Sequence, residues 1–443
     1  MNQPKNFEPT IVKDFNNFLN YCEKAKPPIS KTKEFIRRKD VFEINQLLTN
    51  PHEGLTARND QNHYAQVHLF YHLALNGDLF QLDWSKKSKP CFAPNAEQIE
   101  RFRTLNTTEQ YVFLFQCFYV YSDFEEIVQD LDSRASVPAF EKGLRQLSQL
   151  EENKLYGIWG KNAAKEKIEF NFGNVMTDAS LLFYGQYFGL WEVEESEEYR
   201  YKLRTFAMIS TIKLSTFGKH FITFLVNNAR PVFWNEPFRK SQGEKLPLGF
   251  PLESKLYEFF FDGEAALSNP KKEIEYQSFF TVIQPFFGEA IRADFEIELP
   301  KATKKGNFTL EVVMKYIKPK VTRTIKMGNH LTLEDLHYAI INSVDFDDDH
   351  LYAFYLNKNK RNSYGRMYEY GEPPFACDFT LADLGLSVNK RFNYTFDFGD
   401  NWEFVITIKD FEETDVLFDE PKLIAQKGKS PEQYPSWDDE EEW

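Results

Sequence analysis

Apolar residues occupy every second position on both sides of a short turn near the C-terminal end of the chain. Before the turn they are Phe392, Tyr394, Phe396 and Phe398, and after it they are Trp402, Phe404, Ile406 and Ile408. Period-two alternation places each set on one face of a strand. The connection Gly399-Asp400-Asn401 consists of residues that tolerate positive φ. The pattern predicts a β-hairpin over 392–408 with one buried aromatic face.

The residues before this hairpin predict further strands and one helix. Alternation predicts strands at 291–299 and 308–316, a third at 321–327, and another at 351–356. Thr332 and Asp335 fit a capping box, and the residues that follow carry one apolar face, which predicts a helix that ends near the acidic run Asp345–Asp349. Strands outnumber helices and their neighbours are antiparallel, so an antiparallel α+β domain is expected over 291–420.

Two motifs in this region resemble the plasmid pRiA4b open-reading-frame-three-like family, whose members include passenger proteins of insertion elements. One is an L-x-x-L-H helix followed by D-x-x-H-L-x-x-F, and the other is a Y-x-[FY]-D-[FL]-G-D-x-W hairpin. The signature residues of the hairpin are Tyr394, Asp397, Gly399, Asp400 and Trp402. The resemblance covers about the last third of the chain. The resemblance implies that this region folds as an α+β roll. It identifies a domain and does not imply a particular enzymatic reaction.

The chain departs from this family pattern at two positions. The family often has His just after the Trp-Glu pair, where this chain has Phe404. It also often ends in a Cys-Pro-Pro-Glu-Asp stretch, of which residues 430–435 keep only Pro431-Glu432. Any ligand or acid–base role of the missing histidine in relatives is therefore in doubt for this chain.

Four side chains of this domain are candidates for a metal site, namely His337, His350, Asp397 and Asp400. Imidazole and carboxylate ligands together suit Zn²⁺ or Mn²⁺. The alternative is structural. His337 lies beside an apolar helical stripe, where it can pack, and the two aspartates flank a glycine turn, where they can accept hydrogen bonds from backbone amides. Both interpretations stay open, and a divalent metal is implied only by the first.

The N-terminal region is mostly helical in pattern and contains a weak internal repeat. The triplet at 69–71 precedes Gly77, and the triplet at 182–184 precedes Gly189. In each copy an apolar helix stops at a glycine, a hairpin-like segment follows, and a new helix begins at Pro94-Asn95 or at Ser215-Thr216. This order resembles a winged helix, a variant of the helix-turn-helix that often lays a helix in a DNA groove.

Basic residues of the second copy are candidates for contact with nucleic acid. They are Lys202, Arg204, Lys213 and Lys219, whose spacing fits a wing and the following helix. Two features favour a structural or protein-binding role instead. The expected wing tip, 192–198, is acidic, and the expected recognition segment, 171–184, contains neither Lys nor Arg.

Composition and charge narrow the class of protein. Of the 443 residues, 42% are hydrophobic, which supports large cores and excludes a disordered chain. Four dispersed cysteines without a C-x-x-C pair, and an N-terminus without a signal-peptide pattern, favour a cytoplasmic location. The longest apolar run, 111–121, is too short to cross a bilayer, so no membrane partner is expected. The net charge of −14 is uneven, because residues 291–443 carry 19 basic and 29 acidic residues while 201–250 carry 8 basic and 2 acidic.

These observations predict a two-part protein. Its expected parts are an N-terminal arm with helices (1–60), two winged-helix-like units with further helices (61–160 and 161–290), the α+β domain (291–420) and a flexible acidic tail (421–443). No complete catalytic motif accompanies them. The leading hypothesis is a non-enzymatic binding or adaptor protein linked to mobile elements, with protein or nucleic acid as its partner. The alternatives are a metal-dependent hydrolase or nuclease and a structural scaffold.

Overall fold

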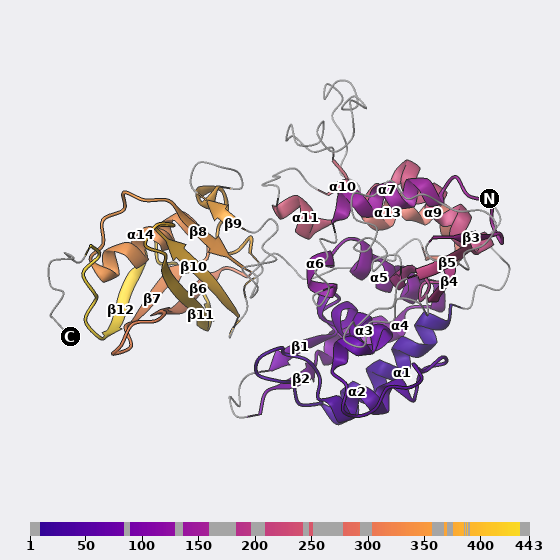
Figure 1. The fold of residues 1–443 in the computed structure, drawn as a ribbon, viewed down its shortest axis with the longest axis horizontal. Helices are drawn as coiled ribbons and strands as arrows, with labels where there is room; N and C mark the ends of the chain where they lie inside the picture. Colours follow the sequence, from indigo (N-terminus) through magenta and orange to yellow (C-terminus); the bar gives the residue numbers. More distant parts are fainter. Residues whose placement is uncertain are drawn as a thin grey trace, which may run out of the picture. The chain divides into compact units, whose positions relative to one another are not determined.

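The computed structural model of the chain describes residues 9–83, 89–128, 136–158, 183–195, 209–241, 248–250, 278–292, 304–356, 367–369, 375–384, 386, 388 and 390–434. The chain divides into two compact units, the first covering residues 1–240 and 244–299 and the second covering 241–243 and 300–443 (Figure 1). Described helices are concentrated in the first unit and a large antiparallel sheet fills the second, so the α+β class is confirmed. Within the described residues, no helix is both long and apolar enough to cross a membrane.

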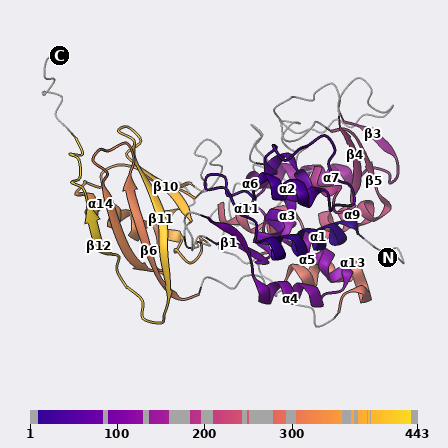
Figure 2. The same cartoon turned by 90° about the horizontal axis from the view of Figure 1, so that it is seen from below.

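The first unit begins with helices and a short hairpin, and it continues with a second hairpin and further helices (Figures 1 and 2). Its first part contains α1 (Thr10–Ala25), α2 (Arg38–Asn45), the 3₁₀ helix η1 (Gln61–His63), α3 (Ala65–Asn76), β1 (Phe80–Asp83), β2 (Cys91–Pro94), α4 (Ala96–Thr104), α5 (Thr107–Tyr119) and α6 (Phe124–Ile127). Its second part contains α7 (Val137–Leu147), β3 (Leu155–Gly157), β4 (Trp191–Glu195), β5 (Ile209–Leu214), α9 (Thr216–Asn228), α10 (Pro231–Trp234), α11 (Glu236–Ser241), α13 (Phe279–Phe287) and the 3₁₀ helix η3 (Gly288–Ala290).

The two hairpins are built alike. β1 pairs antiparallel with β2, and Pro28 forms an isolated bridge to Cys91 on the other side of β2. In the same way β4 pairs antiparallel with β5, and β3 lies on the other side of β5, which gives the strand order β3-β5-β4. In both copies, therefore, an upstream segment adds to the second strand of the hairpin.

The turn that leads into each hairpin also repeats, although not at the residues that the sequence pattern pairs. The Leu79 N–H donates to the Ala74 carbonyl (2.9 Å), and the Leu190 N–H donates to the Gly185 carbonyl (3.1 Å). The left-handed residue before each leucine is Asp78 (φ 54°) in the first copy and Gly189 (φ 70°) in the second. The predicted pairing of Gly77 with Gly189 is therefore wrong by one residue, because aspartate takes the position that requires positive φ.

The helix after each hairpin begins at the residue that the sequence predicts. The Asn95 side chain accepts a hydrogen bond from the Gln98 N–H at the start of α4. The Ser215 side chain accepts one from the Gly218 N–H at the start of α9. These N-caps satisfy backbone donors that a helix start leaves unpaired.

The core of the first unit is centred on α5, which lies between the helices of the first repeat and α9 and α13 of the second (Figure 1). Every α5 residue from Tyr111 to Tyr119 is buried. The Phe115 ring lies 4.9 Å from the Phe221 ring of α9, and the Phe113 ring lies 5.2 Å from the Phe102 ring of α4. Two tyrosine hydroxyls of α5 also donate to carbonyls of the second repeat, Tyr111 to Phe188 (2.9 Å) and Tyr119 to Ala229 (2.7 Å).

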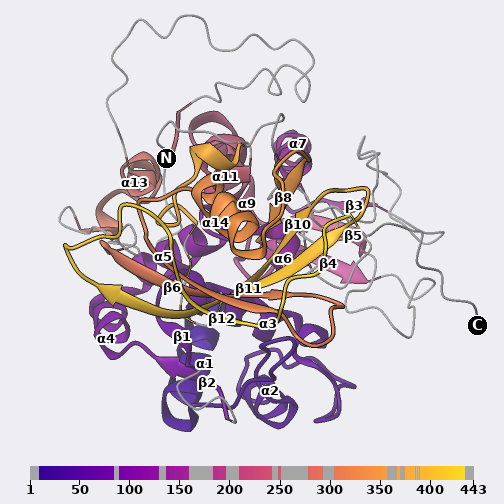
Figure 3. The ribbon, with the colours of Figure 1, turned by 90° about the vertical axis from the view of Figure 1, so that its left-hand side faces the viewer.

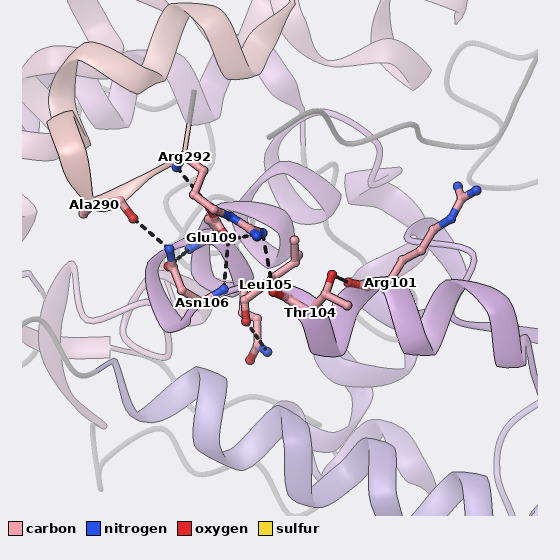
Figure 4. A network of polar contacts seen from close by, with 8 residues as sticks. Arg101, Thr104, Leu105, Asn106, Glu109, Ala290 and Arg292 are labelled. Carbon is pink, nitrogen blue, oxygen red and sulfur yellow. Dashed lines mark hydrogen bonds and ion pairs between the residues drawn. The ribbon is translucent and has the colours of Figure 1, made fainter. Parts of the chain in front are cut away.

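The N-terminus of α5 is held by a buried carboxylate (Figure 4). Asn106 and Glu109 form a capping box, in which each side chain accepts a hydrogen bond from the other residue's backbone N–H. Arg292 lies at the end of the described part of the first unit, and its guanidinium donates to both oxygens of Glu109 at 2.8 Å. Burial alone would raise the pKa of Glu109, but these bonds and the charge of Arg292 lower it.

The second unit contains an antiparallel sheet (Figure 2). Its seven described strands follow the order β12-β7-β6-β11-β10-β8-β9. Its elements are β6 (Gly306–Met314), β7 (Thr322–Gly328), α14 (Leu333–Val344), β8 (Tyr352–Tyr355), β9 (Met367–Glu369), the 3₁₀ helix η5 (Ala376–Asp378), β10 (Arg391–Phe396), β11 (Trp402–Glu413) and β12 (Lys422–Lys427). The helix α14 belongs to this unit (Figure 3), and its buried residues lie in the core of the unit. The predicted capping box of α14 is confirmed, since Thr332 and Asp335 cap each other's backbone N–H.

The hairpin predicted from the alternating aromatic residues is β10 and β11, but the prediction is wrong for Phe398, because β10 ends at Phe396 and Phe398 is exposed in the turn. Phe392 pairs with Ile406, Tyr394 with Phe404 and Phe396 with Trp402, and the inward side chains of both strands are buried apart from the half-buried Trp402. Most of the strand expected at 291–299 lies outside the described residues. Ile291, at its start, packs in the core of the first unit.

The prediction of a flexible tail from residue 421 is wrong for the residues that the structure describes. Lys422–Lys427 form β12, which pairs antiparallel with β7 at the edge of the sheet. The pairing contains a bulge between Leu423 and Ala425. All six side chains of β12 are exposed, so the segment lacks the buried alternate positions that identify a strand in a sequence.

The two glycines that meet at the second hairpin allow a matched test of the turn. An alanine Cβ at Gly218 would lie 1.7 Å from the Leu190 carbonyl oxygen, whereas one at Gly189 would have nothing within 4 Å. We expect Gly189→Ala to lower the free energy of unfolding by about 1 kcal/mol through its positive φ alone. Gly218→Ala should lower it by about 3 kcal/mol because backbone must move. Urea unfolding followed by circular dichroism measures both, and equal losses would contradict the described contact.

The capping network predicts that Arg292 stabilises the first unit. Arg292→Met leaves the Glu109 carboxylate buried without its charged partner, so we expect a loss of about 2–3 kcal/mol in the free energy of unfolding. Lys39→Met is the matched control, because it breaks an exposed pair with Glu43 and should cost less than about 0.5 kcal/mol. Thermal and urea unfolding provide the measurement, and similar losses in the two variants would show that the network contributes little.

Candidate functional site

Three segments that are far apart in the sequence meet at one end of the sheet in the second unit. They are the loop 345–351 after α14, the turn 397–401 between β10 and β11, and the segment 428–434 after β12. The Asp397 N–H donates to the Leu351 carbonyl (2.9 Å), which joins the first two segments. The Gln433 amide exchanges hydrogen bonds with the backbone of Asp347 (2.6 and 3.1 Å), which joins the first and the third.

Asp397 builds the hairpin turn. Its carboxylate accepts hydrogen bonds from the Gly399 N–H (2.8 Å) and the Asp400 N–H (3.3 Å). Its backbone lies in the left-handed region (φ 53°), as does that of Asn401 (φ 56°). The Asp397 side chain is buried while Phe398, the next residue, is exposed. The turn therefore uses one carboxylate internally and presents an aromatic ring outward.

His350 lies between two carboxylates at the same end. Its Nε2 is 3.6 Å from an oxygen of Asp349 and 3.6 Å from an oxygen of Asp397. The Tyr434 hydroxyl donates to Asp349 (3.2 Å). Partial burial, this bond and the charges of Asp349, Asp397 and Asp400 raise the pKa of Tyr434 to about 12. The electrostatic potential around Tyr434 is therefore negative.

His337 occupies a different environment, inside the core. Its ring stacks on Tyr352 with the centroids 3.7 Å apart, and its Nδ1 shares a hydrogen bond of 2.6 Å with the Tyr394 hydroxyl. Burial lowers the pKa of His337 from its ordinary 6.5 to about 3, so the ring is neutral at pH 7. The packing role proposed for this histidine matches these contacts.

The four candidate metal ligands do not form one ligand set. His337 contacts tyrosines, whereas His350 and Asp397 lie together at the sheet end. Within the part of the chain that the structure describes, no group of three or more His, Cys, Asp or Glu side chains could hold a metal ion. Convergence of His337, His350, Asp397 and Asp400 on a metal is therefore not observed.

Two of the four basic residues considered for nucleic-acid contact lie in the described residues, and both have internal partners. Lys213 forms an ion pair with Glu192 on the neighbouring strand (2.6 Å). The Lys219 ammonium donates to the carbonyls of Ser148 (2.5 Å) and Leu150 (2.7 Å), just after the C-terminal end of α7. Lys202 and Arg204 lie outside the described residues.

The helix in the place of a recognition helix in the first repeat is α3, which precedes the β1–β2 hairpin. All of its residues from Ala65 to Ala74 are buried. A helix that reads a DNA groove needs one face open to base edges. The corresponding segment of the second copy, 171–184, is described only at Phe183 and Tyr184, which are also buried.

Sequence reasoning missed part of the sheet-end surface, because exposed apolar residues carry no periodicity. Leu351 and Tyr434 were not among the predicted site residues. The run of carboxylates at 345–349 is the signal that could have identified this surface. Its meeting with 397–401 and 428–434 depends on the sheet register, which brings together residues more than 80 positions apart.

Because His337 is buried in its neutral form, the stability of the second unit should depend on pH. Its folded pKa (about 3) lies below its unfolded value (6.5), so stability is full above pH 6.5 and falls as the pH drops toward 3. Between pH 7 and pH 5 this residue should account for a loss of about 2 kcal/mol. In His337→Phe, which keeps the stack on Tyr352, that share should vanish. Urea unfolding at both pH values gives the difference, and an unchanged pH dependence would contradict the assignment.

The match of the chain to a known family falls within the second unit. Residues 307–434 match the family described as "Plasmid pRiA4b ORF-3-like protein". A solved structure, "Crystal Structure of Protein of Unknown Function MM3350 from Methanosarcina mazei Go1", is 25% identical over 29% of this chain and 73% of its own, with a TM-score of 0.25. No curated protein matches the chain significantly. The resemblance that the two signatures indicate is thus confirmed for residues 307–434, which match the plasmid pRiA4b ORF-3-like family.

Proposed function

We propose that the chain is a non-enzymatic binding or adaptor protein that works through protein contacts, associated with mobile genetic elements or their control. The observation that carries this proposal is the burial of α3 on all sides. The helix that would enter a groove in a DNA-binding winged helix is here part of a core, so the repeated unit serves as a framework. The plasmid origin named in the matched family supports the genetic context.

The charges of the segment 33–60 support the same proposal. Its basic residues near α2 are matched by acids: Arg38 and Lys33 pair with Asp60, and Arg37 pairs with Asp40. A surface that binds phosphates keeps its cations available to replace counterions. Cations already paired with carboxylates gain less from a phosphate, which favours a protein surface as the partner.

A second candidate is contact with nucleic acid through the second repeat. The strand order β3-β5-β4 is the arrangement expected of a winged-helix sheet, and residues 201–250 carry the excess of basic residues noted above. Such contact would involve phosphates and would show little sequence preference. The acidic strand β4 opposes it, because Glu192 and Glu194 lie on the hairpin itself.

We place the protein in the cytoplasm under this proposal. The four cysteines, Cys22, Cys91, Cys117 and Cys377, form no disulfide bond, which suits a reducing compartment. A purely structural scaffold remains the third alternative. It differs from an adaptor in forming a permanent complex, so the mass of the native assembly at low concentration distinguishes the two.

Binding to duplex DNA, single-stranded DNA and RNA tests the choice between protein and nucleic acid. We expect dissociation constants weaker than about 10 µM at 150 mM salt for all three, measured by fluorescence anisotropy from 50 to 300 mM salt. Tight binding with a steep salt dependence would contradict the protein-contact proposal. In that case, and if Lys213 contacts a phosphate, Lys213→Gln should lower the slope of the logarithm of the binding constant against the logarithm of the salt concentration by about one. The variant His337→Phe, which changes a buried core residue, serves as the control.

A further inference from the structure

Exposed apolar side chains gather at the end of the second unit where the three segments meet. Leu351, Phe398 and Tyr434 have exposed fractions of 47%, 43% and 44%. They are neighbours, because Leu351 bonds to Asp397 through its backbone and Tyr434 bonds to Asp349 through its hydroxyl. The His350 ring lies 6.0 Å from the Tyr434 ring and connects the two sides. We call Leu351, Phe398, Tyr434 and His350, together with the carboxylates of Asp347, Asp348 and Asp400, the acidic-aromatic patch.

Three carboxylates of the patch lack a Lys or Arg partner among the described residues. Asp347, Asp348 and Asp400 are exposed and form no ion pair with a described Lys or Arg. Four glutamates on the strands of the sheet, by contrast, form ion pairs with lysines. Lys409 pairs with Glu311, Lys315 with Glu403 (2.7 Å), Lys326 with Glu412 (2.6 Å) and Lys304 with Glu413 (2.8 Å). Four carboxylates of the sheet are therefore paired with lysines, whereas the three beside the exposed rings are not.

We propose that the acidic-aromatic patch docks a basic peptide segment of a protein partner. Lys or Arg side chains of the segment meet the carboxylates, and an apolar residue packs against Phe398 and Leu351. Arg can also stack on the ring of Tyr434 or Phe398. Aromatic anchors surrounded by charge are the usual composition of a binding centre, and charge complementarity selects the partner and speeds its approach.

The patch fits a transient contact rather than a permanent one. Three exposed apolar side chains cover much less area than a stable interface requires. The affinity should therefore depend strongly on the carboxylates and fall as salt screens them. This inference rests on the proposed function, since it names the chemistry of the partner that an adaptor would hold.

A fluorescein-labelled twelve-residue probe with the repeat Arg-Leu-Lys-Gly tests the proposal on the full chain by anisotropy. Two matched probes carry Glu or Gln at every basic position. We expect the basic probe to bind, to weaken at least fivefold between 50 and 300 mM salt, and to bind at least tenfold more tightly than either matched probe. Equal binding of the three probes, or no binding of the basic probe, would overturn the assignment.

Two sets of variants locate the binding. Asp347→Asn/Asp348→Asn/Asp400→Asn should weaken the basic probe at least tenfold. The control Asp415→Asn/Asp419→Asn/Glu420→Gln removes the same charge from the loop before β12, at the opposite end of the sheet, and should change affinity less than twofold. Phe398→Ser should weaken binding at both salt concentrations, whereas Val416→Ser, exposed in that opposite loop, should not. Equal losses in test and control would show a general charge effect and refute the patch.

The outcome separates this inference from the proposed function. If the chain binds neither the basic probe nor nucleic acid, the adaptor proposal stands and only the assignment of the patch is refuted. A chain that hydrolyses a substrate in the presence of metal would overturn the proposed function, whatever the patch binds.

Discussion

The helix α5, buried from Tyr111 to Tyr119, constrains the first unit more than any other element. Its residues from Tyr111 to Tyr119 are buried on every face, and residues of both repeats pack against it in one core. A helix surrounded by protein cannot leave its first backbone N–H groups to water. The carboxylate of Glu109 meets that need at the N-terminus, and Arg292 compensates its charge. The last described residue of the unit is thereby connected to its centre.

The sequence predicts those elements in which a repeating pattern coincides with a local hydrogen bond. The β10–β11 hairpin combines alternation with a turn of small polar residues, and α14 combines an apolar stripe with a capping box, so both are found where the pattern places them. The starts of α4 and α9 at Asn95 and Ser215 follow from side-chain capping in the same way. Each of these features is decided within a few residues.

Elsewhere the structure depends on contacts between residues distant in the chain, and the sequence pattern is silent or misleading. Lys219 was a candidate for contact with nucleic acid, with a structural role as the alternative, and its ammonium donates to carbonyls about 70 residues away. His337 and His350 belong to one family motif, yet α14 turns the first into the core while the loop leaves the second at the surface. Matching glycine to glycine also gave the wrong alignment of the two repeats. The feature that recurs at Asp78 and Gly189 is a positive backbone φ and not the residue type.

The edge strand β12 has a consequence for how the protein behaves when it is crowded. An exposed strand with a regular backbone invites other chains to extend the sheet, and long flat edges promote fibre formation. Here the bulge between Leu423 and Ala425 breaks the spacing of donors and acceptors, and Lys422 and Lys427 place like charges at both ends. Two copies brought edge to edge would repel each other and could not continue the ladder, so the sheet ends at seven described strands and the chain resists uncontrolled polymerisation.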